Sequence, residues 1–106
     1  MKKDITHLIE QDEQLEQRLE ISLSGIFASE DEDGDVSVKG EIKSTVGDYL
    51  TSDITLHIAI YDAADRIVGT SADYFEKETF FRFAVFDLFT SASNVQVHKI
   101  KLFPSL

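Results

Sequence analysis

The densest group of side chains that could do chemistry is an acidic run, Glu30-Asp31-Glu32-Asp33-Gly34-Asp35. Carboxylates spaced two residues apart around a glycine resemble the first ligands of a calcium-binding loop. With Gly34 as the sixth loop position, however, the twelfth is Gly40, so the glutamate that should close the loop is missing. The run therefore predicts a solvated turn. A weak cation site on the adjacent carboxylates of residues 30–35 is the alternative.

Other catalytic or ligand-binding patterns are missing from the sequence. The histidines His7, His57 and His98 lack the spacing of a metal-binding motif. There is no cysteine, no Gly-x-Ser-x-Gly and no glycine-rich phosphate loop. The paired carboxylates are mostly sequential and in turns, unlike the opposed pair of a glycosidase. We predict no catalytic residue, no metal ligand and no cofactor, and we do not expect an enzyme.

Phenylalanines are concentrated late in the chain. If residues 80–86 form one strand, Phe80, Arg82 and Phe86 share one face, and Phe81 and Phe83 share the other. Arginine flanked by aromatic rings is typical of the centre of a protein interface. The predicted interaction surface is therefore Phe80, Arg82 and Phe86, with an unknown protein or a second copy as the partner. Alternatively, these residues pack beneath a helix or loop of the same chain.

Strands must position these side chains. Ile54, Leu56, Ile58 and Ile60 alternate with more polar residues, which predicts the buried face of a central strand ending at Tyr61-Asp62. Earlier alternation predicts a strand of about ten residues from Leu19 and another over residues 36–43. Asp33-Gly34 is a favoured turn pair for a hairpin between them.

Further strands are predicted over residues 67–73, 80–86 and 95–102, with a polar loop over 87–94. The apolar parity changes within the last strand, which predicts a bulge near His98-Lys99, and Pro104 is expected to end its pairing. Six or seven strands with short connections predict a mainly β, immunoglobulin-like antiparallel β-sandwich.

The N-terminal segment has a different pattern. Ile5, Leu8, Ile9, Leu15 and Leu19 fall on one side of a helix, which predicts a helix over about residues 4–17. A charged, frayed tail is the alternative. We therefore divide the chain into an acidic, helical or flexible segment, residues 1–17, and a β-sandwich domain, residues 18–106.

Length and charge restrict the function. The 106 residues suit one domain, and the formal net charge is −10. Residues 4–35 carry eleven acids against Arg18 alone, so nucleic-acid binding, which needs clustered bases, is not expected. No run is apolar enough for a membrane span. No signal peptide follows Met1, so we expect a cytoplasmic protein, or an envelope or secreted one if the chain is a fragment.

Residues 36–103 resemble the FxLYD domain family. Ile58-Ala59-Ile60-Tyr61-Asp62 matches the motif that names the family, with isoleucine in place of Phe and Leu. Residues 38–44 are similar to its opening G-x-V-x-N strand, with Ser44 in place of Asn. Residues 64–70 are similar to its D-x-x-G-x-V-x-x-T hairpin without the turn glycine, and Phe81-Arg82-Phe83 occupies the place of its aromatic strand. Glu76-Lys77-Glu78 stands where the family has a Pro-Gly-Glu turn.

The resemblance implies an immunoglobulin-like sandwich, often found in bacterial envelope or secreted proteins, with Tyr61 and Asp62 as a structural motif and no established enzymatic site. Together with the residue patterns, it predicts a non-enzymatic protein-interaction or accessory module. The alternative is a small ligand- or cation-binding domain that uses the acidic loop at residues 30–35.

Overall fold

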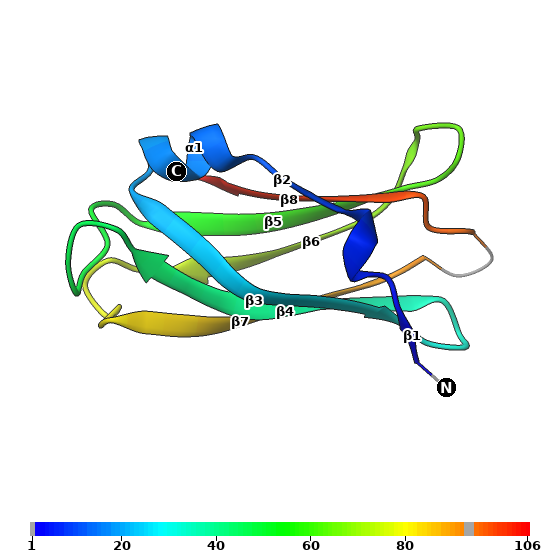
Figure 1. Ribbon diagram of the computed structural model, residues 1–106, viewed down its shortest axis with the longest axis horizontal. Coiled ribbons are helices and arrows are strands. Elements are labelled where there is room, and N and C mark those ends of the chain that lie inside the picture. The colour runs from blue at the N-terminus through cyan, green and yellow to red at the C-terminus, as the bar shows by residue number, and fades with distance from the viewer. Residues whose placement is uncertain (1, 93–94) are drawn as a thin grey trace.

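A computed structural model describes residues 2–92 and 95–106, and it is mainly β. Its described residues form two stacked four-stranded sheets, which confirms the predicted β-sandwich but with eight strands in place of the six or seven expected (Figure 1). The first sheet has the order β1-β3-β4-β7 and the second has the order β2-β8-β5-β6. The strands are β1 (Lys3–Asp4), β2 (Ile9–Gln11), β3 (Ile21–Glu30), β4 (Asp35–Ser44), β5 (Ile54–Tyr61), β6 (Ile67–Phe75), β7 (Phe83–Ser91) and β8 (Lys99–Ser105).

The hairpin between β3 and β4 forms where the sequence predicted it. Gly34 has φ +81°, a conformation that glycine adopts without steric cost. The N–H of Asp31 donates to the carbonyl of Asp35 (3.0 Å), which closes the turn. A register shift between Ser24 and Phe27 puts a bulge in β3, where Gly25 also has positive φ.

Strand β5 is central in the second sheet, as predicted, and it pairs with β6 and β8. Its alternating residues Ile54, Leu56, Ile58 and Ile60 are at most 1% exposed and form much of the core between the sheets. The expectation that Pro104 ends the pairing was wrong, because Pro104 still faces Leu56. Strand β2 stops opposite Leu102, so β8 is an edge strand on that side from residue 103 onward, where proline is tolerated.

The N-terminal segment is part of the sandwich, which corrects the predicted helix over residues 4–17 and the division at residue 17. Strand β1 pairs with β3, and β2 pairs in parallel with β8, so the sandwich is not entirely antiparallel. Ile5 is 2% exposed and lies in the core. A 3₁₀ turn, η1 (Thr6–Leu8), separates β1 from β2, and the helix is confined to α1 (Glu13–Arg18).

Helix α1 begins at Asp12, whose carboxylate accepts a hydrogen bond from the N–H of Leu15, a standard N-cap. Among the described residues, no helix has the length and apolar character that would let it cross a membrane.

The last two strands differ in extent from the sequence prediction. Strand β7 runs to Ser91, so most of the loop expected over residues 87–94 is strand, while Ser93 and Asn94 lie outside the described residues. Strand β8 begins at Lys99 rather than Val95. The expected bulge at His98-Lys99 is therefore not within a strand; instead the N–H of His98 donates to the carbonyl of Tyr61 (2.8 Å) at the strand entrance.

Candidate interaction surface

The predicted surface of Phe80, Arg82 and Phe86 is not formed. Phe80 is 5% exposed and Phe86 is fully buried, and each ring packs in the core between the sheets. Arg82 is exposed, with φ +66°, and its N–H donates to the carbonyl of Asp48 (2.6 Å). Because this left-handed residue interrupts the extended backbone, residues 80–86 are not one strand and do not share one parity.

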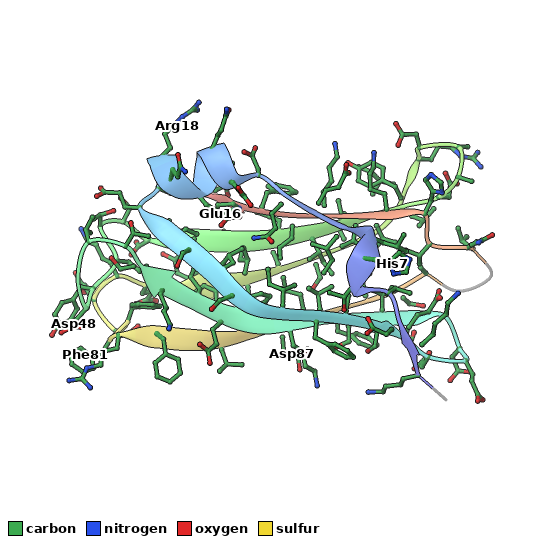
Figure 2. The ribbon with its side chains drawn as sticks, in the orientation of Figure 1. His7, Glu16, Arg18, Asp48, Phe81 and Asp87 are labelled. Carbon is green, nitrogen blue, oxygen red and sulfur yellow. The ribbon has the colours of Figure 1, made fainter. Side chains whose placement is uncertain are left out.

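Three exposed apolar residues lie instead on the outward face of β7. Phe83, Val85 and Phe89 are 52%, 65% and 58% exposed, respectively. They alternate with Ala84, Phe86, Leu88 and Thr90, which point towards the core or are partly covered. Figure 2 shows Asp87, which shares the outward parity, pointing away from the sandwich. We call Phe83, Val85, Asp87 and Phe89 the β7 outer row.

The neighbouring strand surrounds this row with charge of both signs. In the register of β4 and β7, Lys43 faces Phe83, Glu41 faces Val85, and Lys39 faces Asp87. The ammonium of Lys39 lies 4.0 Å from the carboxylate of Asp87. An apolar row with solvated charges along its border is typical of an interaction surface with a polar rim.

Strand β7 is also the edge of its sheet, because β4 is its only paired neighbour among the described strands. The N–H of Ala92 donates to the carbonyl of Gly34 (2.9 Å), which fixes the phase of the antiparallel ladder. Even-numbered residues of β7 direct their backbone groups towards β4. The odd-numbered residues of the outer row direct theirs to the open edge, except that the N–H of Phe83 donates to the carbonyl of Phe81 (2.8 Å).

The second sheet approaches this edge through Gly69 at one end, and Tyr74 and Phe75 of β6 line a hollow with Phe83 and Ala84 near the other. A Cβ atom at Gly69 of β6 would lie 2.9 Å from the Thr90 hydroxyl and 3.2 Å from the Ser91 carbonyl oxygen. Glycine is therefore required where β6 approaches β7. This contact closes the edge at Thr90-Ser91, while the turn at Arg82 bounds the other end.

A small aromatic cluster lies beside that turn. The rings of Tyr49 and Phe81 are 5.6 Å apart between centroids, and the guanidinium of Arg82 lies 5.0 Å from the centre of the Phe81 ring. Figure 2 shows Phe81 and Asp48 together at this end of the sandwich. Both rings are more than half exposed, so the cluster extends the apolar surface of the β7 outer row to the end of the molecule.

The acidic loop brings three carboxylates together. One oxygen each of Asp31, Asp33 and Asp35 lies within 4.8 Å of the others, the only such metal-ligating group within residues 2–92 and 95–106. Asp31 already accepts hydrogen bonds from the N–H groups of Asp33 (3.0 Å) and Asp35 (2.9 Å). Its carboxylate therefore stabilises the turn, so the position of Asp31 is explained without a bound cation.

The histidines do not converge. His57 stacks on Phe103 with 5.0 Å between ring centroids, and its Nε2 lies 2.8 Å from the Ser105 hydroxyl. Figure 2 shows His7 on the 3₁₀ turn, and His98 precedes β8. None of the three belongs to the one cluster of potential metal ligands in the described part of the chain.

Tyr61 and Asp62 are structural in different ways. Asp62 is 8% exposed, and its carboxylate accepts hydrogen bonds from the N–H groups of Ala64 and Arg66 and from the Arg66 guanidinium. These bonds close the turn between β5 and β6. The ring of Tyr61 is half-buried beneath the ammonium groups of Lys99 (4.6 Å) and Lys101 (5.2 Å).

The surface predicted from the sequence did not include Val85 or Phe89, and it assigned Phe83 to the face opposite the predicted surface. The exposure of residues 83–91 alternates in the structure, but the sequence of this strand does not show it. It was obscured because both faces carry apolar residues and because nothing in the sequence marks Arg82 as left-handed.

Comparisons with known proteins do not assign the chain to a family. No family model matches it, and no curated protein matches it. One solved structure that resembles it is described as "Crystal structure of putative beta-galactosidase from bacteroides fragilis", with 12% identity and a TM-score of 0.42. The match covers 80% of this chain and 15% of that one. The two stacked sheets themselves define the class, a small β-sandwich domain.

Proposed function

We propose that this protein is a non-enzymatic interaction module that binds a protein partner through the β7 outer row. The observation that carries the proposal is the coincidence of an open strand edge with three half-exposed apolar side chains, Phe83, Val85 and Phe89. Native proteins usually protect such edges with charge, proline or a covering segment. An edge with aromatic side chains is suited to binding an added strand, where the backbone supplies affinity and the side chains supply specificity.

The surroundings of the row support the same function. Lys39, Glu41 and Lys43 form a charged border that can orient a partner without being buried. The resemblance to the FxLYD family is in keeping with an accessory domain of this kind.

Site-specific photo-crosslinking tests the proposal. A photoactivatable residue is placed at Val85 or, as a control, at Ile67, which is also apolar and 58% exposed but lies on β6 of the other sheet. We expect crosslinked products from position 85 in cells that make the protein, and not from position 67. Phe83→Ser with Phe89→Ser should remove them without lowering the melting temperature substantially, because both rings are about half exposed. The same products from both positions, or none from position 85, would reject the proposal.

Cation binding by the acidic loop is the second candidate function, favoured by the proximity of Asp31, Asp33 and Asp35. We rank it lower because Asp31 is already committed to the turn. Millimolar calcium must raise the melting temperature if the native loop binds it. Asp33→Asn is the matched variant, since it alters a ligand while leaving the hydrogen bonds to Asp31 in place. The candidate is excluded if calcium leaves the melting temperature unchanged.

A further inference from the structure

We propose that β7 pairs with β7 of a second copy of this chain about a two-fold axis, so that one continuous sheet crosses both copies. This inference rests on the proposed function and names its partner. The open edge itself determines where the axis lies. The stretch between the Arg82 turn and the contact of Gly69 with Thr90 runs from Phe83 to Phe89, and its centre is Phe86.

A two-fold pairing that uses this whole stretch has one register. Phe83 then faces Phe89 of the second copy, and Val85 faces Asp87 of the second copy, each pair occurring twice by symmetry. All four residues are odd-numbered, so the ladder with β4 directs their C=O groups, and the N–H groups of Val85, Asp87 and Phe89, towards the partner strand. The N–H of Phe83 already donates to the carbonyl of Phe81 (2.8 Å). The pairing buries the aromatic residues of both rows against each other.

The neighbouring registers are less favourable. Centring the axis on Asp87 would place two like carboxylates directly opposite each other, which is destabilising. Centring it on Val85 would place Phe83 opposite Asp87 and leave the Phe83–Phe89 pairs unmade. In the register centred on Phe86, Asp87 keeps Lys39 on one side and has an uncharged valine on the other.

Charge at the two ends of β7 also favours a second copy. Asp35 lies beside Ser91 at one end, next to the carboxylates of Asp31 and Asp33. Lys43 lies beside Phe83 at the other end, next to Arg82. Antiparallel pairing brings Asp35 of each copy to the end where Lys43 and Arg82 of the other lie, although Asp48 and Glu76 also lie at that end.

The net charge of −10 does not prevent this contact. Strand β2 and helix α1 carry Glu10, Glu13 and Glu16 and lie along β8, away from β7 (Figure 1), whereas five of the eleven N-terminal acids lie at residues 30–35, beside the end of β7. Strand β1 lies at the opposite edge of the first sheet from β7. Repulsion between these distant groups is screened over about 8 Å at physiological salt.

Proline substitution combined with sedimentation equilibrium tests the pairing. Val85→Pro removes an N–H that points away from β4, so the sandwich should stay folded while the partner strand loses a donor. We expect a dimer for the wild-type protein and for the matched control Val85→Ala, and a monomer for Val85→Pro with an unchanged circular dichroism spectrum. A wild-type monomer at the highest attainable concentration, or a dimer that survives Val85→Pro, would overturn the inference.

Disulfide crosslinking tests the register, since the native chain has no cysteine. Directly opposed Cα atoms in a hydrogen-bonded pair are about 5.5 Å apart, within disulfide range. Under copper-phenanthroline oxidation, Val85→Cys mixed with Asp87→Cys should form a heterodimer faster than either variant forms a homodimer. Faster homodimerisation of either variant would overturn the Phe86-centred register. If Val85→Pro unfolds the protein, this crosslinking decides the inference, and an absence of any crosslink rejects it.

The two proposals fail separately. If the wild-type chain is a monomer but position 85 crosslinks to a different protein, the second copy is the wrong partner and the interaction module stands. If it is a monomer and position 85 crosslinks to nothing, both proposals fall.

Discussion

Asp62 stabilises the β5–β6 turn through one nearly buried carboxylate. Its pKa is lowered first by the hydrogen bond from the Arg66 N–H, and burial opposes this shift. A lowered pKa means that the ionised carboxylate stabilises the fold above its unfolded pKa of about 3.9, and that this stabilisation is lost as the pH falls through the folded value.

We therefore expect Asp62→Ala to lower the melting temperature at pH 7 and to lower it progressively less in acid. The exposed Asp48, whose side chain has no such bonds, provides the control Asp48→Ala. A deficit for Asp62→Ala that stays constant from neutral pH to about pH 2 would show that its charge is irrelevant.

The pKa of Glu16 is shifted in the opposite direction to that of Asp62. Glu16 is 6% exposed on α1, and burial raises its pKa although Gln11 donates a hydrogen bond to its carboxylate (3.1 Å). Folding thus favours the protonated form, so the ionised carboxylate destabilises the native state as the pH rises above the folded pKa.

Glu16→Gln retains an acceptor for Gln11 and removes the buried charge. We expect it to raise the melting temperature at pH 7 and to have little effect at about pH 3, where the wild-type carboxyl is already neutral. Glu13→Gln, on the exposed side of the same helix, is the control. A lower melting temperature at pH 7 would mean that the ionised carboxylate is favourable where it lies.

At the scale of elements, the N-terminal strands pair with β3 and β8, and the most deeply buried side chain within residues 2–11 is Ile5. Removing it leaves a cavity between β1, β3 and the core, which for a buried isoleucine costs about 2–5 kcal/mol. Ile5→Ala should therefore lower the free energy of unfolding in urea by that amount. Ile67→Ala, which changes the same residue type at an exposed site, should cost far less. If the two substitutions lowered the free energy of unfolding equally, the N-terminal segment would be a tail that does not contribute to the core.

The strands that the sequence predicted are those with one buried and one solvated face. Strand β5 could be read from Ile54 to Ile60 because burial on one side imposes a period of two. Strands β1 and β2 could not, because they contain two and three residues and depend on pairing with distant segments. The helical stripe of residues 4–17 was overridden by those pairings, and only its second half, capped at Asp12, remains helix.

The sequence assigned the exposed rings to the wrong residues. The concentration of phenylalanines led to a predicted surface on Phe80 and Phe86, which are buried, whereas Phe83 and Phe89 are exposed. Which face was exposed depended on the conformation of Arg82, whose positive φ is set by a hydrogen bond to Asp48 in a distant loop. No local pattern encodes that contact.

For the whole molecule, acid has two opposing effects on stability. Asp4, Asp53 and Asp65, like Asp62, have lowered pKa values, because their carboxylates accept hydrogen bonds from Thr6, Lys77 and Lys99 respectively. These bonds are weakened only when the carboxylates become protonated. Repulsion within the net charge of −10, by contrast, is relieved as the pH approaches the isoelectric point near 4.5.

We therefore expect the melting temperature to hold or rise slightly from pH 7 to about pH 5 and then to fall below about pH 4, as the four aspartates are protonated. Varying the salt concentration separates charge repulsion from the loss of hydrogen bonds, because salt screens long-range repulsion and screens short hydrogen bonds much less. Raising sodium chloride from about 0.01 M to 0.15 M should increase the melting temperature at pH 7 but should not restore it at pH 3. Calorimetry across this grid checks both statements. A melting temperature that falls steadily from pH 7, or that salt restores fully at pH 3, would mean that these aspartate hydrogen bonds do not control the acid stability of the fold.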